Sequence, residues 1–287
     1  MNIAKSAMPH TSAVERKPTI DDRQMTKDNF FSIDRLSVSF GGLTAVDKVS
    51  LSVQHGTIFS IIGPNGAGKT TIFNCINGLY KPKAGQIIFK GEDITNLKPH
   101  RIAQRGIART FQNIELFSRM TTMENLMLGR HIHMKAGVWS GATFFRRGSK
   151  AAQEEIRHRW RVERIIDLLD LQAARNQFVG SLPYGMQKLV ELGRALALEP
   201  ELLLLDEPSA GMNSEERQDL IFWIKDIQDE LGVTILLIEH DMEMVMDISD
   251  RILVINFGKP ITEGSPEAVQ QHPEVLKAYL GEDGDIG

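Results

Sequence analysis

A glycine-rich segment between an apolar run and a helical pattern constrains the fold of this chain more than any other feature. Residues 63–71 read Gly-Pro-Asn-Gly-Ala-Gly-Lys-Thr-Thr. This is the pattern of a phosphate-binding loop, in which glycine and four residues precede Gly-Lys-Thr. The apolar run 58–62 predicts a buried strand before the loop, and apolar residues at helical spacing after Lys69 predict a helix. Strand, loop and helix in this order predict an α/β fold.

The composition of this segment suits the binding of a nucleoside triphosphate. Glycine allows the backbone conformations that bring several N–H groups onto phosphate oxygens, and the following helix presents its positive end to them. Lys69 is expected to reach the β- and γ-phosphates, and the Thr70 hydroxyl is expected to ligate Mg²⁺. We therefore predict a nucleotide-contacting set of Gly63, Pro64, Asn65, Gly66, Ala67, Gly68, Lys69, Thr70 and Thr71.

A pair of acidic residues follows another apolar run. Residues 202–205 are all leucine, and Asp206, Glu207 and Pro208 come directly after them. A continuous apolar run is typical of a parallel strand covered on both faces. Asp206 is predicted to serve a Mg²⁺ ion, and Glu207 is predicted to activate water as a general base. Acidic residues also suit the start of a helix, but the phosphate-binding loop favours the catalytic interpretation.

Composition limits the remaining possibilities. The 287 residues carry a net charge of −4, which gives no general attraction to nucleic acid. Cys75 is the single cysteine, so the chain forms no internal disulfide, which fits a reducing compartment. No apolar run approaches the roughly 18 residues of a membrane span. Residues 1–28 lack the apolar block of a signal peptide and are predicted to form a mobile tail. We expect a cytoplasmic protein.

Strand and helix patterns alternate along the rest of the chain. Strands are expected near residues 36–40, 46–53, 85–90 and 233–238, with a hairpin over 252–262. Helical patterns dominate about 118–188, including a long charged helix over 154–171, and interrupt the α/β core as a subdomain. Residues 266–280 predict one C-terminal helix. The expected division is a tail (1–28), a main domain (29–264), and a C-terminal helix and tail (265–287).

Several short motifs occur in a specific order after the phosphate-binding loop. They are Thr110-Phe111-Gln112, residues 182–187, residues 205–208, residues 209–213 and Glu239-His240. In this order the chain resembles the ATP-binding subunit of an ABC transporter, from about residue 33 to 281. The resemblance implies a P-loop NTPase (RecA-like) core, an N-terminal antiparallel β portion and an inserted α-helical subdomain. It also implies ATP hydrolysis with Mg²⁺.

The same resemblance implies roles for individual residues. Phe40 resembles the aromatic residue that stacks on adenine, and Val46 is placed with it at the nucleotide. Gln112 resembles the switch residue that contacts Mg²⁺ and water, and His240 resembles the γ-phosphate sensor. Tyr184, Gly185 and Met186 are expected to close the ATP site of a second subunit, and residues 211–213 are expected to cross to that subunit.

The signature motif departs from the common Leu-Ser-Gly-Gly-Gln. Residues 182–186 read Leu-Pro-Tyr-Gly-Met, so Pro183 replaces a serine whose hydroxyl contacts the γ-phosphate of the partner site. A lost neutral hydrogen bond costs about 0.5–1.5 kcal/mol. ATP-driven dimerisation is therefore expected to be weaker than in a Pro183→Ser variant.

Within the family, the segments 106–113, 210–213 and 238–242 resemble the ATPases of branched-chain or hydrophobic amino-acid uptake systems. This implies permease subunits, a second ATPase subunit (an identical copy or a paralogue) and, indirectly, a substrate-binding protein. The chain would then lie on the inner face of the membrane through the permeases. Residues 279–283 also resemble a lipopolysaccharide-export ATPase, and a non-transport ATPase acting on nucleic acid or ribosomes is a third alternative. Leu116, Phe117, Met120, Met123 and Leu126 could either receive a permease helix or form subdomain core.

Overall fold

Two sheets organise the protein, and the computed structural model describes them within residues 30–134 and 150–280. The predicted tail 1–28 lies outside the described residues. The first sheet is antiparallel, in the order β2 (Leu43–Val53), β1 (Phe31–Phe40), β4 (Ala84–Phe89) and β5 (Glu92–Asp93). Phe31 of β1 pairs with Val53 on one side and with Phe89 on the other. The sheet confirms the predicted antiparallel portion.

The second sheet carries the chemistry. Its order is β10 (Lys259–Gly264), β9 (Arg251–Asn256), β3 (Ile58–Ile62), β8 (Thr234–Ile238), β7 (Leu202–Asp206) and β6 (Ile107–Arg109). All neighbours pair in parallel except β9 and β10, which form the predicted antiparallel hairpin. Because parallel strands end at one edge, the loops after β3, β7 and β8 lie together there. Strand β6 was not predicted, since three residues are too few for a strand pattern.

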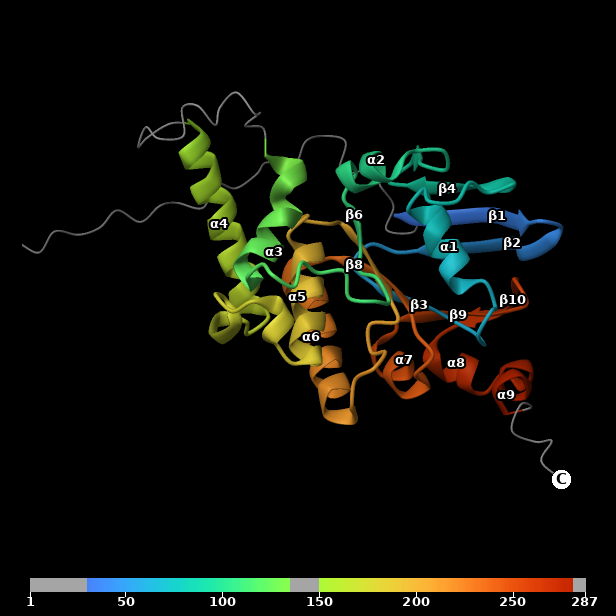
Figure 1. Cartoon of the computed structure of the whole chain (residues 1–287). Coiled ribbons are helices and arrows are strands. Elements are labelled where there is room, and N and C mark those ends of the chain that lie inside the picture. Colours follow the sequence, from blue (N-terminus) through green and yellow to red (C-terminus); the bar gives the residue numbers. More distant parts are fainter. Residues whose placement is uncertain (1–29, 135–149, 281–287) are drawn as a thin grey trace, which may run out of the picture.

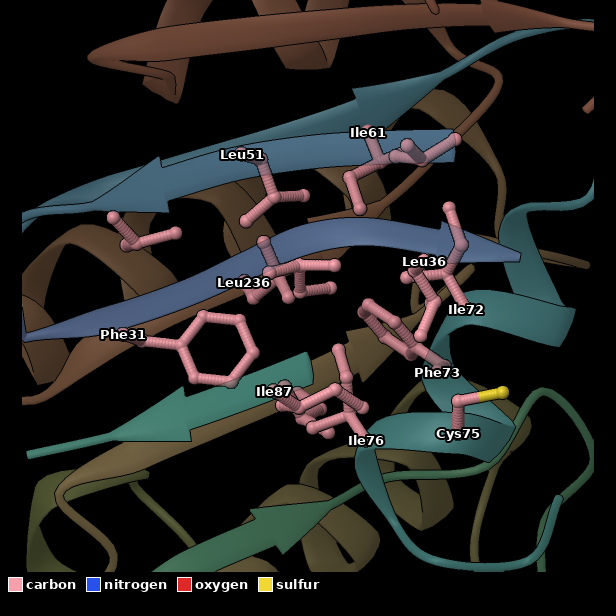
Figure 2. Packing of buried hydrophobic residues seen from close by; sticks show 14 of the residues in the cluster. Phe31, Leu36, Leu51, Ile61, Ile72, Phe73, Cys75, Ile76, Ile87 and Leu236 are labelled. Atoms are coloured by element: carbon pink, nitrogen blue, oxygen red, sulfur yellow. The ribbon is translucent and has the colours of Figure 1, made fainter. Parts of the chain in front are cut away.

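The main core lies between the two sheets and around helix α1 (Lys69–Ile76). Figure 2 shows Ile72, Phe73 and Ile76 of this helix among side chains of both sheets. Phe31 and Ile87 come from the antiparallel sheet and, like the helix residues, are less than 2% exposed. Packing of this density fixes the helix that follows the phosphate-binding loop.

Helices lie on the opposite side of the parallel sheet: α5 (Tyr184–Leu196) and α6 (Ser214–Leu231), with α3 (Thr122–Gly129) and α4 (Lys150–Leu168) packed beside α5 (Figure 1). Along β7, Leu202 and Leu204 face the first core, while Leu203 and Leu205 face the helices. The strand is thus buried on both faces, as its continuous apolar run predicts. The predicted subdomain limit at residue 188 falls inside α5.

Short helices complete the chain: α2 (Pro99–Gln104), η3 (Arg130–His133), η5 (Gln172–Ala174), η6 (Val179–Ser181) and α7 (Met242–Ile248). The single C-terminal helix predicted over residues 266–280 is wrong. The structure has α8 (Pro266–Gln270) and α9 (Pro273–Leu280), separated by Gln271 and His272. Pro273 lacks a backbone N–H and disfavours helical geometry at His272, so the first helix ends before it. No helix within the described residues is both long and apolar enough to span a bilayer.

Candidate functional site

The phosphate-binding loop joins the end of β3 to the start of α1. Gly68 is the N-cap of α1, with φ of 103°, and no side chain caps the helix. No acidic residue lies in its first turn. The N-termini of α3 and α6 differ, since Thr121 and Asn213 cap them with their side chains. The first N–H groups of α1 therefore keep their positive potential for an anion.

Glycine is required in this loop by close backbone contacts. A Cβ atom at Gly63 would lie 2.1 Å from the Ile255 carbonyl oxygen, and one at Gly68 would lie 2.5 Å from that of Ala45. Both distances are far below van der Waals contact. Strand β9 and the β2 backbone therefore hold the loop in one shape.

Lys69 is buried within the loop. Its Nζ donates to the carbonyl oxygens of Gly63 at 2.6 Å and Pro64 at 3.1 Å. Burial lowers the pKa of the Lys69 ammonium, and the carboxylates of Glu207 and Asp206 oppose that shift. The structure thus brings the predicted phosphate-binding lysine close to the predicted general base Glu207 and the predicted magnesium residue Asp206.

Asp206, the last residue of β7, forms a buried ion pair with Arg109 of β6. The Arg109 guanidinium donates to Asp206 Oδ2 at 2.5 Å and to Asn74 Oδ1 at 2.7 Å, and the two charged side chains are 6% and 2% exposed. The other carboxylate oxygen, Oδ1, is buried without a hydrogen-bond partner. An oxygen left free at the edge of the site suits a hard cation.

The predicted magnesium residues supply oxygen donors only. Thr70 and Gln112 are exposed, and Asp206 contributes the unpaired Oδ1. Within residues 30–134 and 150–280 no group of three or more His, Cys, Asp or Glu side chains could hold a metal. This donor set fits Mg²⁺, which binds through one or two protein oxygens while phosphates and water complete its shell.

Glu207 has a strained backbone at the position predicted for the general base. Its φ is +47°, in the left-handed region that costs a non-glycine residue free energy. The Glu207 N–H donates to the Ile238 carbonyl oxygen at 2.8 Å, which ties the residue to the end of β8. Its Oε2 accepts a hydrogen bond from Gln112 Nε2, also at 2.8 Å. The two predicted catalytic residues are therefore in direct contact.

His240 follows β8, and its side chain is 58% exposed. The preceding residue, Glu239, is fully buried. Its carboxylate accepts hydrogen bonds from the backbone N–H groups of Ser209 at 2.8 Å and His240 at 3.0 Å. Glu239 thereby fixes the loop that follows Glu207 against the loop that presents His240.

Phe40 and Val46, which are both predicted at the nucleotide, differ in exposure. Phe40 is exposed at the end of β1, and its ring meets that of Tyr80 edge-to-face at a centroid distance of 5.2 Å. Val46, in contrast, is 0% exposed and belongs to the core. Its side chain packs beneath Gly68 and supports the loop, and the predicted place of Val46 at the nucleotide stays a prediction.

The signature residues Tyr184, Gly185 and Met186 form the first turn of α5, with Pro183 at the N-cap. The Tyr184 hydroxyl donates to the Ala210 carbonyl oxygen at 3.1 Å. A Cβ atom at Gly185 would lie 2.7 Å from Glu216 Oε1. The signature turn thus packs against residues 210–216 of its own chain.

Several residues of the site were not singled out by the sequence. Arg109 was noted only within a family segment, and Glu239 only as the neighbour of His240. Asn125 is buried and binds the backbone of the loop 117–121 through both ends of its amide. An arginine at the end of a short apolar stretch and a buried asparagine in a helix give no local signal of these contacts.

Comparison with known proteins assigns the family. The ABC transporter family model matches residues 46–210. The chain belongs to the ABC transporter family. A second family model, the branched-chain amino acid ATP-binding cassette transporter, matches residues 259–285. Members of this family hydrolyse ATP to drive transport, and this chain is therefore an ATP hydrolase coupled to transport.

Two curated relatives are similar over most of their length. The chain is 45% identical over 253 residues to the high-affinity branched-chain amino acid transport ATP-binding protein BraF of Pseudomonas aeruginosa, covering 87% of this chain and 97% of BraF. It is 42% identical over 254 residues to LivG of Escherichia coli K12, which carries the same description, covering 88% and 97%.

Solved structures agree with the fold. The ADP conformation of MJ1267, an ATP-binding cassette of an ABC transporter, superposes with a TM-score of 0.76 at 32% identity, covering 89% of this chain and all of MJ1267. A nucleotide-free ATP-binding cassette from an ABC transporter gives a TM-score of 0.74 at 30% identity, covering 87% of this chain and 98% of that cassette. The predicted P-loop NTPase fold is confirmed.

Proposed function

We propose that this chain is the ATP-hydrolysing motor subunit of a transporter that takes up branched-chain or related amino acids. The observation that carries the ATPase chemistry is the contact of Gln112 with Glu207 beside the Lys69 loop. Support for the solute comes from the two similar relatives and from the family match over residues 259–285.

In this proposal different residues of the chain bind the phosphates, bind the adenine and activate water. The loop 63–71 and the N-terminus of α1 bind the phosphates, with Lys69 exchanging its carbonyl partners for phosphate oxygens. Phe40 stacks on the adenine ring. Glu207 takes a proton from the attacking water, and the hydrogen bond from Gln112 helps to hold the Glu207 carboxylate toward that water. His240 contacts the γ-phosphate. Thr70, Gln112 and Asp206 would hold Mg²⁺, which supplies charge neutralisation for the phosphates when bound.

We infer that a second ATPase subunit completes each site. The Tyr184–Met186 turn is exposed at Tyr184 but packs on residues 210–216 of its own chain. The turn would contact the γ-phosphate bound by the partner, with Gly185 offering its backbone N–H. ATP then favours the closed pair because it binds that state more tightly than the open one.

Permease subunits would receive the motion and keep the protein on the inner face of the membrane. Among the residues considered for this contact, Met123 and Leu126 are buried and form core. Phe117 is 57% exposed and lies five residues after Gln112. We therefore place the permease contact at Phe117. The binding protein that selects the amino acid would act on the permeases.

The export alternative has less support. Its motif over residues 279–283 falls in the segment matched by the branched-chain amino acid model, and side chains there are outside the described residues. The non-transport alternative has no similar observation in its favour.

The function is tested by extracting membranes that carry a tagged copy in mild detergent and identifying the co-purifying proteins by mass spectrometry. The proposal predicts two polytopic permeases together with a second ATPase subunit. A Lys69→Ala copy serves as a control, since the loss of ATP binding should leave the permease contact in place. Export-type membrane subunits would favour the export alternative, and ribosomal or DNA-bound partners without a membrane protein would overturn the transport assignment.

A further inference from the structure

A row of charged side chains follows the signature turn along α5. Lys188, Glu191 and Arg194 stand three residues apart, so they form one slanted row on the helix surface. Lys188 is 5% and Glu191 2% exposed, and Arg194 is half-buried. Lysine and glutamate are almost never fully buried unless they are paired, so this row requires partners.

The partners are backbone groups of one short segment, residues 111–115. Lys188 Nζ donates to the Gln112 carbonyl oxygen at 2.8 Å. The Glu115 N–H donates to Glu191 Oε1 at 3.4 Å, and the Phe111 backbone also hydrogen-bonds to this carboxylate. Arg194 Nη1 donates to the Glu115 carbonyl oxygen at 2.5 Å. Every member of the row therefore holds the segment that carries Gln112.

Burial makes this arrangement dependent on all of its members. It raises the pKa of the Glu191 carboxyl and lowers the pKa of the Lys188 ammonium, while each group attracts the other. It also lowers the pKa of the Arg194 guanidinium. Buried charges that are held this way resist separation, because moving one away leaves the others without a partner.

The same helix is fixed to the residues around Phe117. Helix α3 packs so closely on α5 that a Cβ atom at Gly129 would lie 2.4 Å from the Arg194 carbonyl oxygen. Asn125 of α3 accepts a hydrogen bond from the Phe117 N–H at 3.0 Å and donates to the Phe117 carbonyl oxygen at 3.1 Å. The contacts thus continue from the signature turn to the segment of Gln112 and to Phe117.

We propose that Lys188, Glu191 and Arg194 join the signature turn and the Gln112 segment into one rigid unit. The inference rests on the proposed dimeric site. When the partner's ATP draws in Tyr184–Met186, helix α5 carries Gln112 and Phe117 with it. Contact with one nucleotide is then transmitted to the switch residue of the other site and to the permease contact. The three residues act as positioning residues, since their side chains bind backbone groups of the Gln112 segment.

Hydrogen exchange of the full chain in a Glu207→Gln background tests this proposal. With Lys188 present, ATP and Mg²⁺ are expected to slow exchange in residues 184–189 and 112–117 together. In Lys188→Met, residues 184–189 should keep this protection. Residues 112–117 should exchange about tenfold faster, as expected for one lost charge-assisted hydrogen bond, and should no longer respond to ATP.

Three further variants separate positioning from folding. Lys188→Arg keeps a cationic donor and should restore the coupled response. Lys225→Met removes a lysine from an exposed pair with Asp247 and should leave both segments unchanged. If Lys188→Met does not fold, Lys188→Met/Glu191→Gln removes both buried charges and should show the same uncoupling.

Two results would contradict the proposal in different ways. An unchanged ATP response at 112–117 in a folded Lys188→Met or double variant would overturn the rigid unit. No ATP protection at 184–189 even in the Glu207→Gln parent would overturn the dimeric site, and the rigid unit with it.

Discussion

Gln112 Nε2 donates a hydrogen bond to Glu207 Oε2 over 2.8 Å, although 95 residues separate them in sequence. Glu207 follows β7, and Gln112 lies three residues beyond the end of β6, the strand beside it. The pairing of these two strands therefore brings Glu207, the predicted general base, to Gln112, the predicted switch residue. We expect any change in the segment of Gln112 to act directly on the Glu207 carboxylate.

The Arg109–Asp206 pair should be a large contributor to stability. Arg109→Met leaves the buried Asp206 charge without its partner, so we expect the free energy of unfolding to fall by about 3–5 kcal/mol. Denaturant unfolding measures this loss. Arg251→Met is the control, because its pair with Glu263 is partly exposed, at 51% and 27%, and should contribute less than about 1 kcal/mol. Equal effects of the two substitutions would show that burial of the Arg109–Asp206 pair adds nothing to its contribution to stability.

Pro183 should weaken the closed dimer. Pro183→Ser supplies a hydroxyl toward the partner's γ-phosphate, so ATP-driven dimerisation should tighten by roughly two- to tenfold, the equivalent of one neutral hydrogen bond. The measurement is the dimer dissociation constant at saturating ATP. Pro183→Ala is the control, since it changes the backbone without adding a hydroxyl. Equal or weaker dimerisation of the serine variant would refute the prediction.

Cys75 should be unreactive in the folded protein. Burial in the core raises the pKa of its thiol to about 12. At pH 8 only about one thiol in ten thousand would then be the reactive thiolate. Reaction with a thiol reagent should be at least about 100-fold slower in native buffer than in denaturant, and should speed up as pH rises toward 12. Rapid labelling of the native protein at pH 8 would show that the thiol is accessible.

Phe117→Glu should break the permease contact without harming the ATPase. Because the ring is exposed, we expect the substitution to change the free energy of unfolding by less than about 0.5 kcal/mol. ATP hydrolysis by the purified protein should persist. Co-purification with the permeases should be lost. Met123→Glu offers the contrast, since that side chain is buried and its replacement should prevent folding. A Phe117→Glu protein that unfolds would assign Phe117 to the core.

The sequence predicted the elements that have long apolar patterns. Residues 202–205 could be recognised as a doubly covered strand because every position is apolar, and the loop 63–71 could be recognised from its glycines. Strand β6 was too short to show a period. The C-terminal helix was predicted as one element although Pro273 carries the signal that divides it.

Contacts between distant segments account for the rest. Asp206 and Glu207 could be assigned roles from their place after a strand, but the partner of Asp206 depends on β6 lying beside β7. Val46 was placed at the nucleotide by resemblance alone, and its burial beneath Gly68 follows from how the two sheets pack. The sequence around Lys188, Glu191 and Arg194 is that of an ordinary charged helix. Only the structure shows that these side chains bind the segment 111–115.

The mass of the Glu207→Gln protein at saturating ATP and Mg²⁺ tests the dimeric ATP site most directly. Removing the carboxylate that is proposed to activate water should slow hydrolysis by about 10²–10⁴-fold while leaving ATP binding intact. In the presence of ATP, light scattering should then give twice the 32.2 kDa mass of one chain. Without ATP it should give the mass of a single chain. A Glu207→Gln protein that binds ATP and remains a monomer would contradict an ATP site shared between two subunits.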